Sequence, residues 1–589
     1  MDNQRLLIWA TFGMLAWMTY QAWLADYGPD STGQPQSPVG QVAPTTADDG
    51  GIPALSQDES DTPPITSADA APTLDAVPQA TTENAVPVIH VQTDVLDLDI
   101  STVGGTLVRA ELLKYPVSKE QPDVLIELLS PGTVEYGQIR TGLNDSGSGA
   151  KADHNAVYTS ERSEYVLGSA DELVVPLTWS NAQGITVEKT IRFTPGSYRI
   201  DISHRLINNS DVEWAGAEYA QLRRRTSTNE RSMFDVDSYS TDGPIIYDGE
   251  KSEKLDRDDL VSDGPFAIKA TNGWIGAIQH HFLSAVVPTA DSQYNYNVAV
   301  SGTVATASLI QTPIIRIAPG GEYTFETTAF VGPKLQAQLE DIAESLSLTV
   351  DYGWLTIISH PLFLLLSWVY SFVGNWGLAI IVVTILIKAA FYKLTEASGR
   401  SMAKMREIQP RMKSLQDRYK DDRQALSQAM MELYKREKVN PAAGCLPILI
   451  QMPFFLAFYW VLLESVEMRQ APFAFWLTDL SSRDPYFILP IIMGAAMLGQ
   501  QKLNPTPGDP VQAKVMQVMP IIFTAFFAFF PSGLVLYWVT NTLLSIAQQW
   551  YINKVVHEEA AARKGNKKSK DKDKDKDKDK DKDKDKAKS

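Results

Sequence analysis

Cysteine is almost absent from this sequence, since Cys445 is the single thiol among 589 residues. One thiol cannot form an internal disulfide framework or a cysteine-based zinc site. Histidine is also scarce, and 7 scattered residues leave little for a metal cluster. We therefore expect neither a metal site nor a cofactor, and the function has to come from other side chains.

Positive charge is scarce in the first part of the chain. Asp26–Val350 contains 46 acidic and 20 basic residues, whereas the remainder contains 24 acidic and 33 basic residues. An acidic half is therefore joined to a basic half that is far more apolar. This division predicts two parts of different kinds.

Long uncharged runs predict membrane helices. Leu6–Leu24 has 19 uncharged residues, about 28 Å as a helix, which is close to the ~30 Å hydrocarbon core. Its end at Ala25 fits a signal-peptide cleavage site poorly, so we expect an uncleaved anchor. Four further spans are predicted at Phe372–Phe391, Cys445–Leu463, Tyr486–Leu503 and Val518–Thr540. The apolar run Pro361–Tyr370 is too short to cross and is expected to lie at the interface.

Lysine and arginine near the span ends predict the orientation. They gather in Lys388–Lys438 and in the tail from Asn553, but are sparse in Glu464–Pro485. With Arg5 inside, five crossings are predicted to place Asp26–Val350 outside and both basic segments inside. The fold class expected is a polytopic α-helical membrane protein with five transmembrane helices, N-terminus in, and a large exported domain.

The exported half begins with a tether. Asp26 to about Val86 is rich in Pro, Ala, Thr, Ser and Asp and cannot bury enough surface to fold. From Val88 onward, apolar and polar residues alternate between Gly, Pro and Asn turns, which predicts an antiparallel β domain of two packed sheets. Gln336–Thr349 is expected to form a linking helix. No spacing of acidic residues or of His280-His281 singles out a catalytic pair, so no enzyme is expected.

Four segments of the apolar half are unusually specific: SMAKMREIQPRMKSLQDRY, EKVNPAAGCLPILIQMPFFLAFYWVL, SVEMRQAPFAFWLTDLSSRDPYFILPIIMG and FFPSGLVLYWVTN. Over roughly Ser359–Ile552 they closely resemble the YidC/Oxa/Alb family of membrane protein insertases, in its Gram-negative bacterial form. The resemblance implies an inner-membrane insertase and chaperone that acts alone or with the Sec translocon. It also implies a periplasmic domain of β-supersandwich type.

Lys388 follows ten residues, Leu378–Ile387, that are all apolar except Thr384. Counted from Gly377 it lies about 16 Å into the span, and a cation at the bilayer centre costs about 2.5–3.5 kcal/mol. Lys388 therefore either faces a water-filled cavity or extends to the inner interface. The resemblance favours the cavity, because the family carries an Arg here in a hydrophilic groove. A lysine keeps that charge but loses the planar five-donor fork.

Other polar and aromatic residues are candidates for the same groove. Thr384 lies one turn before Lys388, Gln451 interrupts the third span, and Thr540 and Asn541 end the fifth. The resemblance adds the substrate-contact positions Phe455, Met493, Tyr537 and Trp538. Each has an alternative interpretation: a polar group bonded to a neighbouring helix, an interfacial aromatic belt, or ordinary methionine packing.

The inner loop is predicted to be a helical hairpin over 398–438, because apolar residues recur there at steps of three and four. The resemblance implies a docking surface, for which the candidates are Met402, Met405, Met412, Tyr419 and Met430; a plain connection between spans is the alternative. The tail, with eight Asp-Lys pairs at Asp571–Lys586, is expected to be disordered. Its lysines are candidates for contact with ribosomal RNA or anionic lipid; a plain solvated tail is the alternative.

We predict a protein that receives hydrophobic segments of nascent membrane proteins in a positively charged groove and releases them into the bilayer. Implied partners are those nascent chains, the Sec translocon, the ribosome, the signal recognition particle and lipid. The rivals are a solute transporter or channel, and a sugar-binding exported domain on a membrane anchor. The expected domains are an anchor at 1–25, a linker at 26–87, a β domain at 88–350, an interfacial helix at 351–371, an insertase core at 372–552 and a tail at 553–589.

Overall fold

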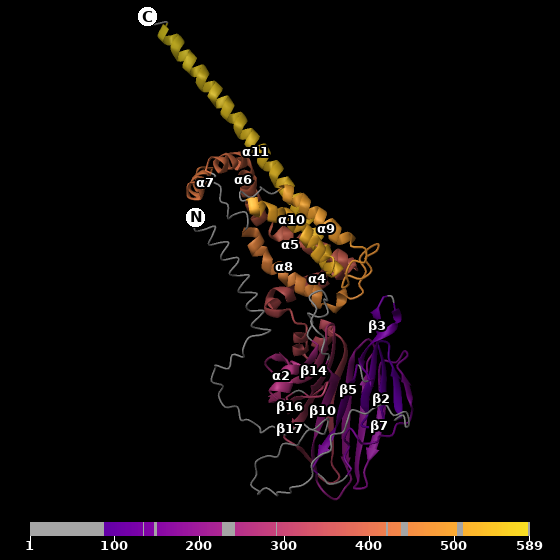
Figure 1. The fold of residues 1–589 in the computed structure, drawn as a ribbon. Coiled ribbons are helices and arrows are strands. Elements are labelled where there is room, and N and C mark those ends of the chain that lie inside the picture. Colours follow the sequence, from indigo (N-terminus) through magenta and orange to yellow (C-terminus); the bar gives the residue numbers. More distant parts are fainter. Residues whose placement is uncertain are drawn as a thin grey trace. The chain divides into compact units, whose positions relative to one another are not determined.

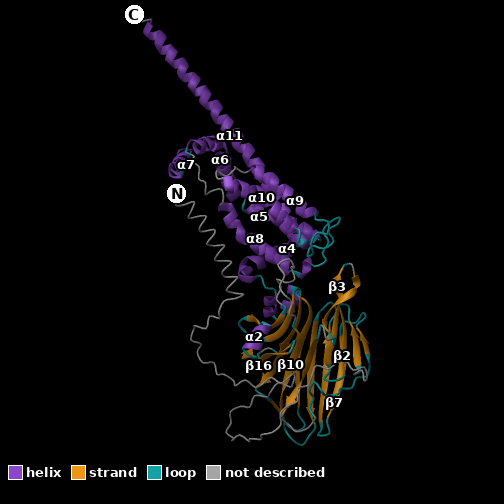
Figure 2. Ribbon diagram, viewed as in Figure 1, coloured by secondary structure: helices purple, strands orange, loops and turns teal. Residues whose placement is uncertain are grey.

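The computed structural model describes residues 87–119, 121–132, 135–146, 150–226, 242–289, 291–419, 422–437, 446–503 and 510–586, and of residues 423, 446–448, 510–513 and 560–586 it describes the backbone alone. The predicted anchor and tether lie outside these residues, apart from residue 87. The chain divides near residue 351 into a unit of strands and a unit of helices, and the helical unit begins at Tyr352 (Figure 2). Each unit is described by itself.

The strand unit contains two sheets (Figure 1). The 11-stranded sheet has the order β13-β16-β17-β10-β5-β3-β2-β1-β6, with β4 paired to β3 and β18 to β10. Its strands are β1 (Val88–Gln92), β2 (Leu96–Ser101), β3 (Thr106–Ser118), β4 (Gln121–Leu129), β5 (Gly137–Asp145), β6 (Glu164–Val166), β10 (Trp214–Arg225), β13 (Phe266–Thr271), β16 (Gln293–Ser301), β17 (Val304–Thr312) and β18 (Ile315–Ile317).

The 8-stranded sheet has the order β12-β11-β14-β15-β19-β9-β8-β7. Its strands are β7 (Leu173–Ser180), β8 (Ile185–Phe193), β9 (Arg199–Asn208), β11 (Gly243–Tyr247), β12 (Ser252–Lys254), β14 (Trp274–Gln279), β15 (Phe282–Pro288) and β19 (Glu322–Pro333). Apart from the parallel pair β1–β6, the pairings are antiparallel. The expectation of a large antiparallel β domain is thus confirmed.

Alternation along the strands builds the core of this unit. In β8, Val187 and Ile191 are completely buried, whereas Glu188 and Thr190, which point to the other face, are more exposed. Lys189 lies on the same inward face and is also fully buried. Its Nζ donates to Gly104 O at 2.8 Å and Thr141 O at 3.2 Å. The sequence pattern predicts the sheet, but not a lysine inside it.

Three helices connect or extend this part: α2 (Arg257–Ser262), α3 (Gln336–Ile342) and the 3₁₀ helix Glu344–Thr349. The single linking helix predicted over Gln336–Thr349 is therefore wrong in detail. Ala343 takes an extended conformation between the two pieces, with φ −156° and ψ 128°, and no helix continues through such a residue.

The helical unit contains α4 (Thr356–Val373), α5 (Trp376–Ala390), α6 (Tyr392–Arg418), α7 (Arg423–Glu437), α8 (Leu446–Glu464), α9 (Ile488–Leu503), α10 (Pro510–Phe527) and α11 (Ser532–Lys586) (Figure 1). Within the described residues, Gly353–Val373 is the one helix of sufficient length and apolar character to cross a membrane. The bent pair Trp376–Ala390 and Tyr392–Arg418, which meet at 68°, also satisfies this criterion if it is taken as one span.

The boundary of the second predicted span is wrong. The chain turns between α4 and α5, where Gly374 is left-handed at φ 64° and Asn375 Oδ1 accepts from Leu378 N at 3.0 Å. Phe372 and Val373 consequently belong to α4, and α5 has 15 residues. The apolar helix before this turn is 18 residues long, longer than the predicted run Pro361–Tyr370. Its position at the interface stays a prediction.

The predicted fifth span is wrong too, because Val518–Thr540 is split between two helices. Helix α10 ends at Phe527 and α11 begins at Ser532, just after Pro531. Proline has no N–H for an i→i−4 bond, but it fits just ahead of a new helix. The split also bears on an inconsistency in the predicted topology. Five crossings that start from an inside N-terminus would leave the basic tail outside, although the tail was predicted to lie inside.

The tail differs from its prediction as well. Helix α11 runs without a break from Ser532 to Lys586, through the segment expected to be disordered (Figure 1). Extending an existing helix needs no new nucleation. The Asp-Lys alternation places opposite charges three residues apart and like charges four residues apart, so charge pairing gives no clear net support. The expectation of disorder was therefore wrong for the backbone of this segment.

Candidate functional site

Lys388 lies in the last turn of α5, two residues before the helix ends at Ala390. The sequence predicted that Lys388 would lie near the middle of a membrane span. In the structure it lies near the end of a helix instead, because α5 is short and the chain bends by 68° into α6. A cation is favoured at a helix C-terminus by the helix dipole. The structure thus places Lys388 where the backbone itself stabilises positive charge.

The ammonium group of Lys388 is half-buried and directed at α11. Its Nζ donates to Ser545 Oγ at 2.8 Å, and Ser545 Oγ donates to Asn541 O, one turn earlier, at 2.7 Å. Asn541 Oδ1 in turn accepts from Gln451 Nε2 on α8 at 3.4 Å. Three predicted polar residues are therefore connected across α5, α11 and α8. We call Lys388, Ser545, Asn541 and Gln451 the polar chain.

Thr384 is not part of the polar chain. Its side chain is 1% exposed and Oγ1 donates to Ile380 O, four residues earlier, at 2.6 Å. This is the common use of a threonine hydroxyl within a helix. The prediction that Thr384 shares a helix face with Lys388 fits its spacing, but its hydroxyl is already occupied.

An aromatic cluster lies next to the polar chain. Phe455, one turn after Gln451, packs against Tyr537 and Trp538 with ring centroids 5.8 and 4.8 Å apart. Phe458 lies 4.9 Å from Tyr537, while Phe523 and Phe527 of α10 lie 6.2 and 5.0 Å from Trp538. Three of the predicted contact residues are thus brought together. We call these six residues the aromatic cluster.

The two groups of residues have a consistent order along the helices. Gln451 contacts Asn541, whereas Phe455 and Phe458, further along α8, contact Tyr537, which precedes Asn541. Helices α8 and α11 therefore run antiparallel here and meet through long side chains. Phe455 and Trp538 are half-buried, while Tyr537 is 3% exposed. Phe523 is half-buried as well, so the partly exposed rings of the cluster are Phe455, Phe523 and Trp538.

Met493 has a different environment from the other predicted contacts. It is completely buried in α9, the helix that α10 and α11 pack against. Next to it, Gly494 lets the hydroxyl of Thr524 approach the α9 backbone so closely that a Cβ would clash. Met493 therefore serves as packing in this conformation, which is the alternative that the sequence left open.

The α8–α9 connection fixes the start of α11. Asp479 Oδ1 accepts from Gln470 N and Ser481 N at 2.9 and 2.8 Å, which holds the connection folded. Ser532 Oγ donates to Asp479 O at 2.7 Å, and Gly533 N donates to Leu480 O at 2.8 Å. The Gly533 bond, and a further bond from Ser532 N to Ser482 O at 2.7 Å, satisfy N–H groups that are otherwise unpaired at a helix N-terminus. They set the position from which Tyr537 and Asn541 follow.

The hairpin of α6 and α7 exists, and its methionines hold it together. Ile408, Met412, Leu433 and Tyr434 form a buried cluster, against which Met405, Leu415 and Met430 pack. Three of the predicted docking residues therefore face the partner helix. Met402 and Tyr419 are half-buried. Docking through this hairpin stays a prediction.

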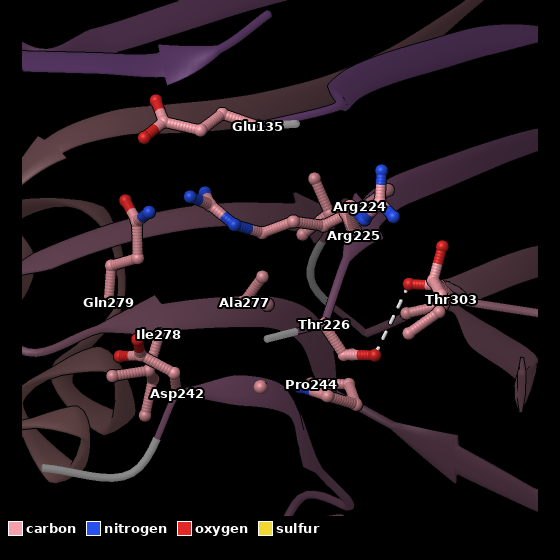
Figure 3. Close-up of a pocket in the computed structure, with 15 residues that line it drawn as sticks. Glu135, Arg224, Arg225, Thr226, Asp242, Pro244, Ala277, Ile278, Gln279 and Thr303 are labelled. Atoms are coloured by element: carbon pink, nitrogen blue, oxygen red, sulfur yellow. Dashed lines mark hydrogen bonds between the residues drawn. The ribbon is translucent and has the colours of Figure 1, made fainter. Parts of the chain in front are cut away.

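A separate pocket of about 540 Å³ lies between the sheets of the strand unit and was not predicted (Figure 3). Arg224, Arg225 and Thr226 line it from the end of β10, with Ala277 and Gln279 from β14. Arg224 donates to Leu128 O at 3.0 Å, and Thr226 Oγ1 donates to Thr303 O at 3.3 Å. Its walls are the small residues Gly276, Ala277, Ala305 and Ala307.

Sequence reasoning missed Ser545, Phe458, Phe523 and Phe527. Ser545 is four residues after Asn541 and therefore on the same face of α11, so its spacing was a usable signal. The phenylalanines carried no such signal, because an apolar helix contains many aromatic residues and only packing distinguishes them.

The chain matches two protein families that together cover most of its length. The family described as YidC periplasmic domain matches residues 88–365, and the family described as 60Kd inner membrane protein matches residues 368–559. The membrane protein insertase YidC of Thioalkalivibrio sulfidiphilus is 47% identical over 574 residues, covering 96% of this chain and 100% of the relative. That of Methylococcus capsulatus is 45% identical over 569 residues, covering 95% and 100%.

A solved structure of an active YidC insertase is similar with 19% identity and a TM-score of 0.37, over 80% of this chain and 93% of that one. The sequence comparisons alone are decisive. The chain belongs to the YidC family of membrane protein insertases, which are inner-membrane proteins with a periplasmic domain. The relatives are named for insertion, which is not an enzymatic activity.

Proposed function

We propose that the polar chain and the half-buried part of the aromatic cluster form a groove that receives a hydrophobic segment of a nascent membrane protein. The observation that carries this proposal is a row of polar groups across three helices. Lys388 donates to Ser545, whose hydroxyl donates to the backbone carbonyl of Asn541, and the side chain of Asn541 accepts from Gln451. The three helices are otherwise strongly apolar. A polar path inside a membrane protein is costly unless it is used or fully paired.

The polar chain supplies what an incoming polar flank loses on leaving water. A peptide group transferred without a compensating hydrogen bond costs about 2–7 kcal/mol. Lys388, Asn541 and Gln451 provide donors and acceptors beside the apolar surface, and water that follows them into the groove adds more. Positive charge at Lys388 favours flanks that carry Asp or Glu.

The aromatic cluster receives the apolar segment itself. Phe455 and Trp538 offer half-buried rings that a client helix can pack against, one turn from Gln451 and Asn541. Trp538 Nε1 has no hydrogen-bond partner within the described residues and is buried. An arriving backbone carbonyl would satisfy that N–H. The client then moves along α8 and α11 into lipid, and a groove open on one side requires no gate.

We infer six crossings for the whole chain: the predicted anchor, α5, α8, α9, α10 and α11. Helix α4, which by length and composition could also cross, is assigned to the membrane interface, as expected from the sequence. The even number of crossings places the N-terminus, the α6–α7 hairpin and the basic tail on the cytosolic side. These positions suit contact with the ribosome, with ribosomal RNA through the tail, and with the signal recognition particle. Cooperation with the Sec translocon belongs to the same proposal and follows from the family.

Site-specific crosslinking tests the groove. A photoreactive residue in place of Gln451 or Trp538 should capture a stalled hydrophobic client, whereas the same residue at Ile521, which is 64% exposed on α10, should capture lipid. Equal capture of client at all three positions would contradict a specific groove. Capture at Ile521 alone would move the path to the outside of α10.

A further inference from the structure

Two arginines lie together on one face of the large sheet. In the β5–β10 register, Gln221 is opposite Arg140 and Arg223 is opposite Gln138. Residues directly opposite each other point to the same side of a sheet, so Arg140 and Arg223 are diagonal neighbours on one face. Diagonal neighbours have a spacing of about 7–8 Å. Both side chains are half-buried.

Neither arginine forms an ion pair with a carboxylate in the described part of the chain. Arg140 donates to Gln138 Oε1 at 3.3 Å, and the Arg223 guanidinium lies 5.7 Å from the Tyr136 ring centroid. The Nε atom of Arg223 is buried without a hydrogen-bond acceptor. Two cations thus share a surface in which one N–H group is left unsatisfied.

Other arginines of the same unit behave differently. Arg109 is 2.9 Å from Asp97, Arg205 is 3.1 Å from Glu188, and Arg316 is 3.0 Å from Glu213. Carboxylates are abundant, since Asp26–Val350 contains 46 acidic residues. The absence of an ion pair at Arg140 and Arg223 is therefore a local arrangement and does not reflect a shortage of acidic side chains.

Neighbouring groups confirm that positive potential is concentrated there. The pKa of Arg140 is lowered by burial and by repulsion from Arg223. Burial lowers the pKa of His154 to about 4; Arg140 and Arg223 add to this shift, and the carboxylate of Asp153 opposes it. His154 Nδ1 lies 2.8 Å from Tyr219 OH, on the same face. A bound anion would relieve this repulsion.

The spacing indicates which anion. Alternate residues of an extended peptide are about 6.6 Å apart and project to the same side, which is close to the separation of diagonal side chains in a sheet. Guanidinium groups bind carboxylates through paired N–H bonds. Two acidic residues separated by one other residue can therefore contact Arg140 and Arg223 at once.

We propose that Arg140 and Arg223 bind a client's acidic flank, in the form of an extended segment with carboxylates at alternate positions, after it has been translocated. This inference rests on the proposed function, because the flank favoured by Lys388 is the one that then emerges on the periplasmic side. Tyr136 and Gln138 flank the site and supply a ring face and an amide to the peptide. A free phosphate or an acidic sugar is the competing ligand.

Peptide binding to the full-length protein in lipid nanodiscs tests the site. A fluorescent peptide with an Asp-x-Asp segment should bind, and its Asn-x-Asn counterpart should bind about tenfold more weakly. The double variant Arg140→Gln/Arg223→Gln should lose that preference. The matched control Arg316→Gln removes an exposed, ion-paired arginine of the same unit and should keep it. Raising the salt to about 1 M should weaken binding in the wild type.

A second measurement guards against misfolding. The bound carboxylates should raise the pKa of His154 in the wild type, followed by NMR, because a nearby anion favours the protonated ring. Arg223→Lys, which keeps the charge, should retain part of the binding. Three results would overturn the proposal. They are equal affinity for both peptides, an unchanged preference in the double variant, and displacement of the peptide by phosphate or glucuronate at concentrations below that of the peptide. Lys388→Ala should leave this affinity unchanged while slowing insertion, so failure of the groove and failure of this site are distinguishable.

Discussion

Replacing Lys388 tests whether its positive charge attracts client segments or whether the lysine only forms a hydrogen bond within the protein. Against an acidic client residue at ~4 Å, with an effective dielectric of ~20, Lys388 would contribute about 4 kcal/mol before desolvation. Its bond to Ser545 Oγ, at 2.8 Å, joins a charged donor to a neutral hydroxyl and is worth about 1.5–3 kcal/mol. A client carboxylate carries the full opposite charge that the hydroxyl lacks and is therefore the better partner.

After desolvation we expect a net effect of about 1–2 kcal/mol, or about tenfold in rate. Lys388→Arg should preserve insertion, since the charge remains. Lys388→Ala should slow clients with acidic flanks by about that factor, and Lys388→Glu should slow them further. Clients with neutral flanks should be affected less in each case.

The assay is insertion of paired clients, identical except for Asp or Asn in the flank, into vesicles containing the purified variants. Lys404→Ala is the control, because Lys404 is an exposed lysine of α6. Ser545→Ala should leave the discrimination intact, since the ammonium group remains. Equal and undiminished rates for both clients in Lys388→Glu would refute the role of charge.

Three further predictions concern the rest of the molecule. Burial lowers the pKa of Lys189 to about 7. Between about pH 7 and 10 the folded form therefore binds fewer protons than the unfolded chain, and the free energy of unfolding rises with pH. Hydrogen exchange in β8 should show this rise, and Lys189→Met should abolish it. Deleting Asp30–Gly320 should leave much of the insertion activity in reconstituted vesicles, and complete loss with the helical unit still folded would assign the function to the strand unit. On a Cys445→Ser background, cysteines introduced at positions 420 and 565 should react only from the cytosolic side and one at position 250 only from outside; labelling of 565 from outside would mean an odd number of crossings.

Much of the fold could be predicted from residue patterns. Period-two alternation identified the strand unit, as in β8, where Val187 and Ile191 face inward. Apolar runs located α8 and α9 to within two residues. These features are local, because the apolar face of a strand or helix is determined by residues close together in the sequence and does not depend on distant partners.

The errors occurred where a break lies inside an apolar run. The turn at Gly374 and the break before Ser532 interrupt segments that read as continuous hydrophobic spans. Hydropathy measures the cost of exposure to water and carries little information on where a helix ends. Pro531 was the available signal, but proline is tolerated within membrane helices, so its presence alone did not determine a break.

The candidate site was predictable residue by residue but not as an assembly. Gln451, Asn541 and Lys388 each looked like a single polar group that could bond to any neighbouring helix. Their connection depends on Ser545 and on the antiparallel contact of α8 with α11, across 90 residues for Gln451 and Asn541 and 157 for Lys388 and Ser545. No sequence pattern fixes which helices meet.

The presence of lysine, where the family resemblance implies an arginine, can be understood from this assembly. An ammonium group has three N–H donors around one atom, and one of them is directed at Ser545 Oγ. Because Lys388 is half-buried, the other two are free to meet water or a client carboxylate. The dipole at the end of α5 stabilises the charge by about 0.3–1 kcal/mol, which offsets part of the cost of holding a cation among apolar helices. If the partner is a mobile client flank, as we propose, it arrives in no fixed orientation. A planar fork is then unnecessary, and a rotatable point charge at the end of a helix can follow the flank.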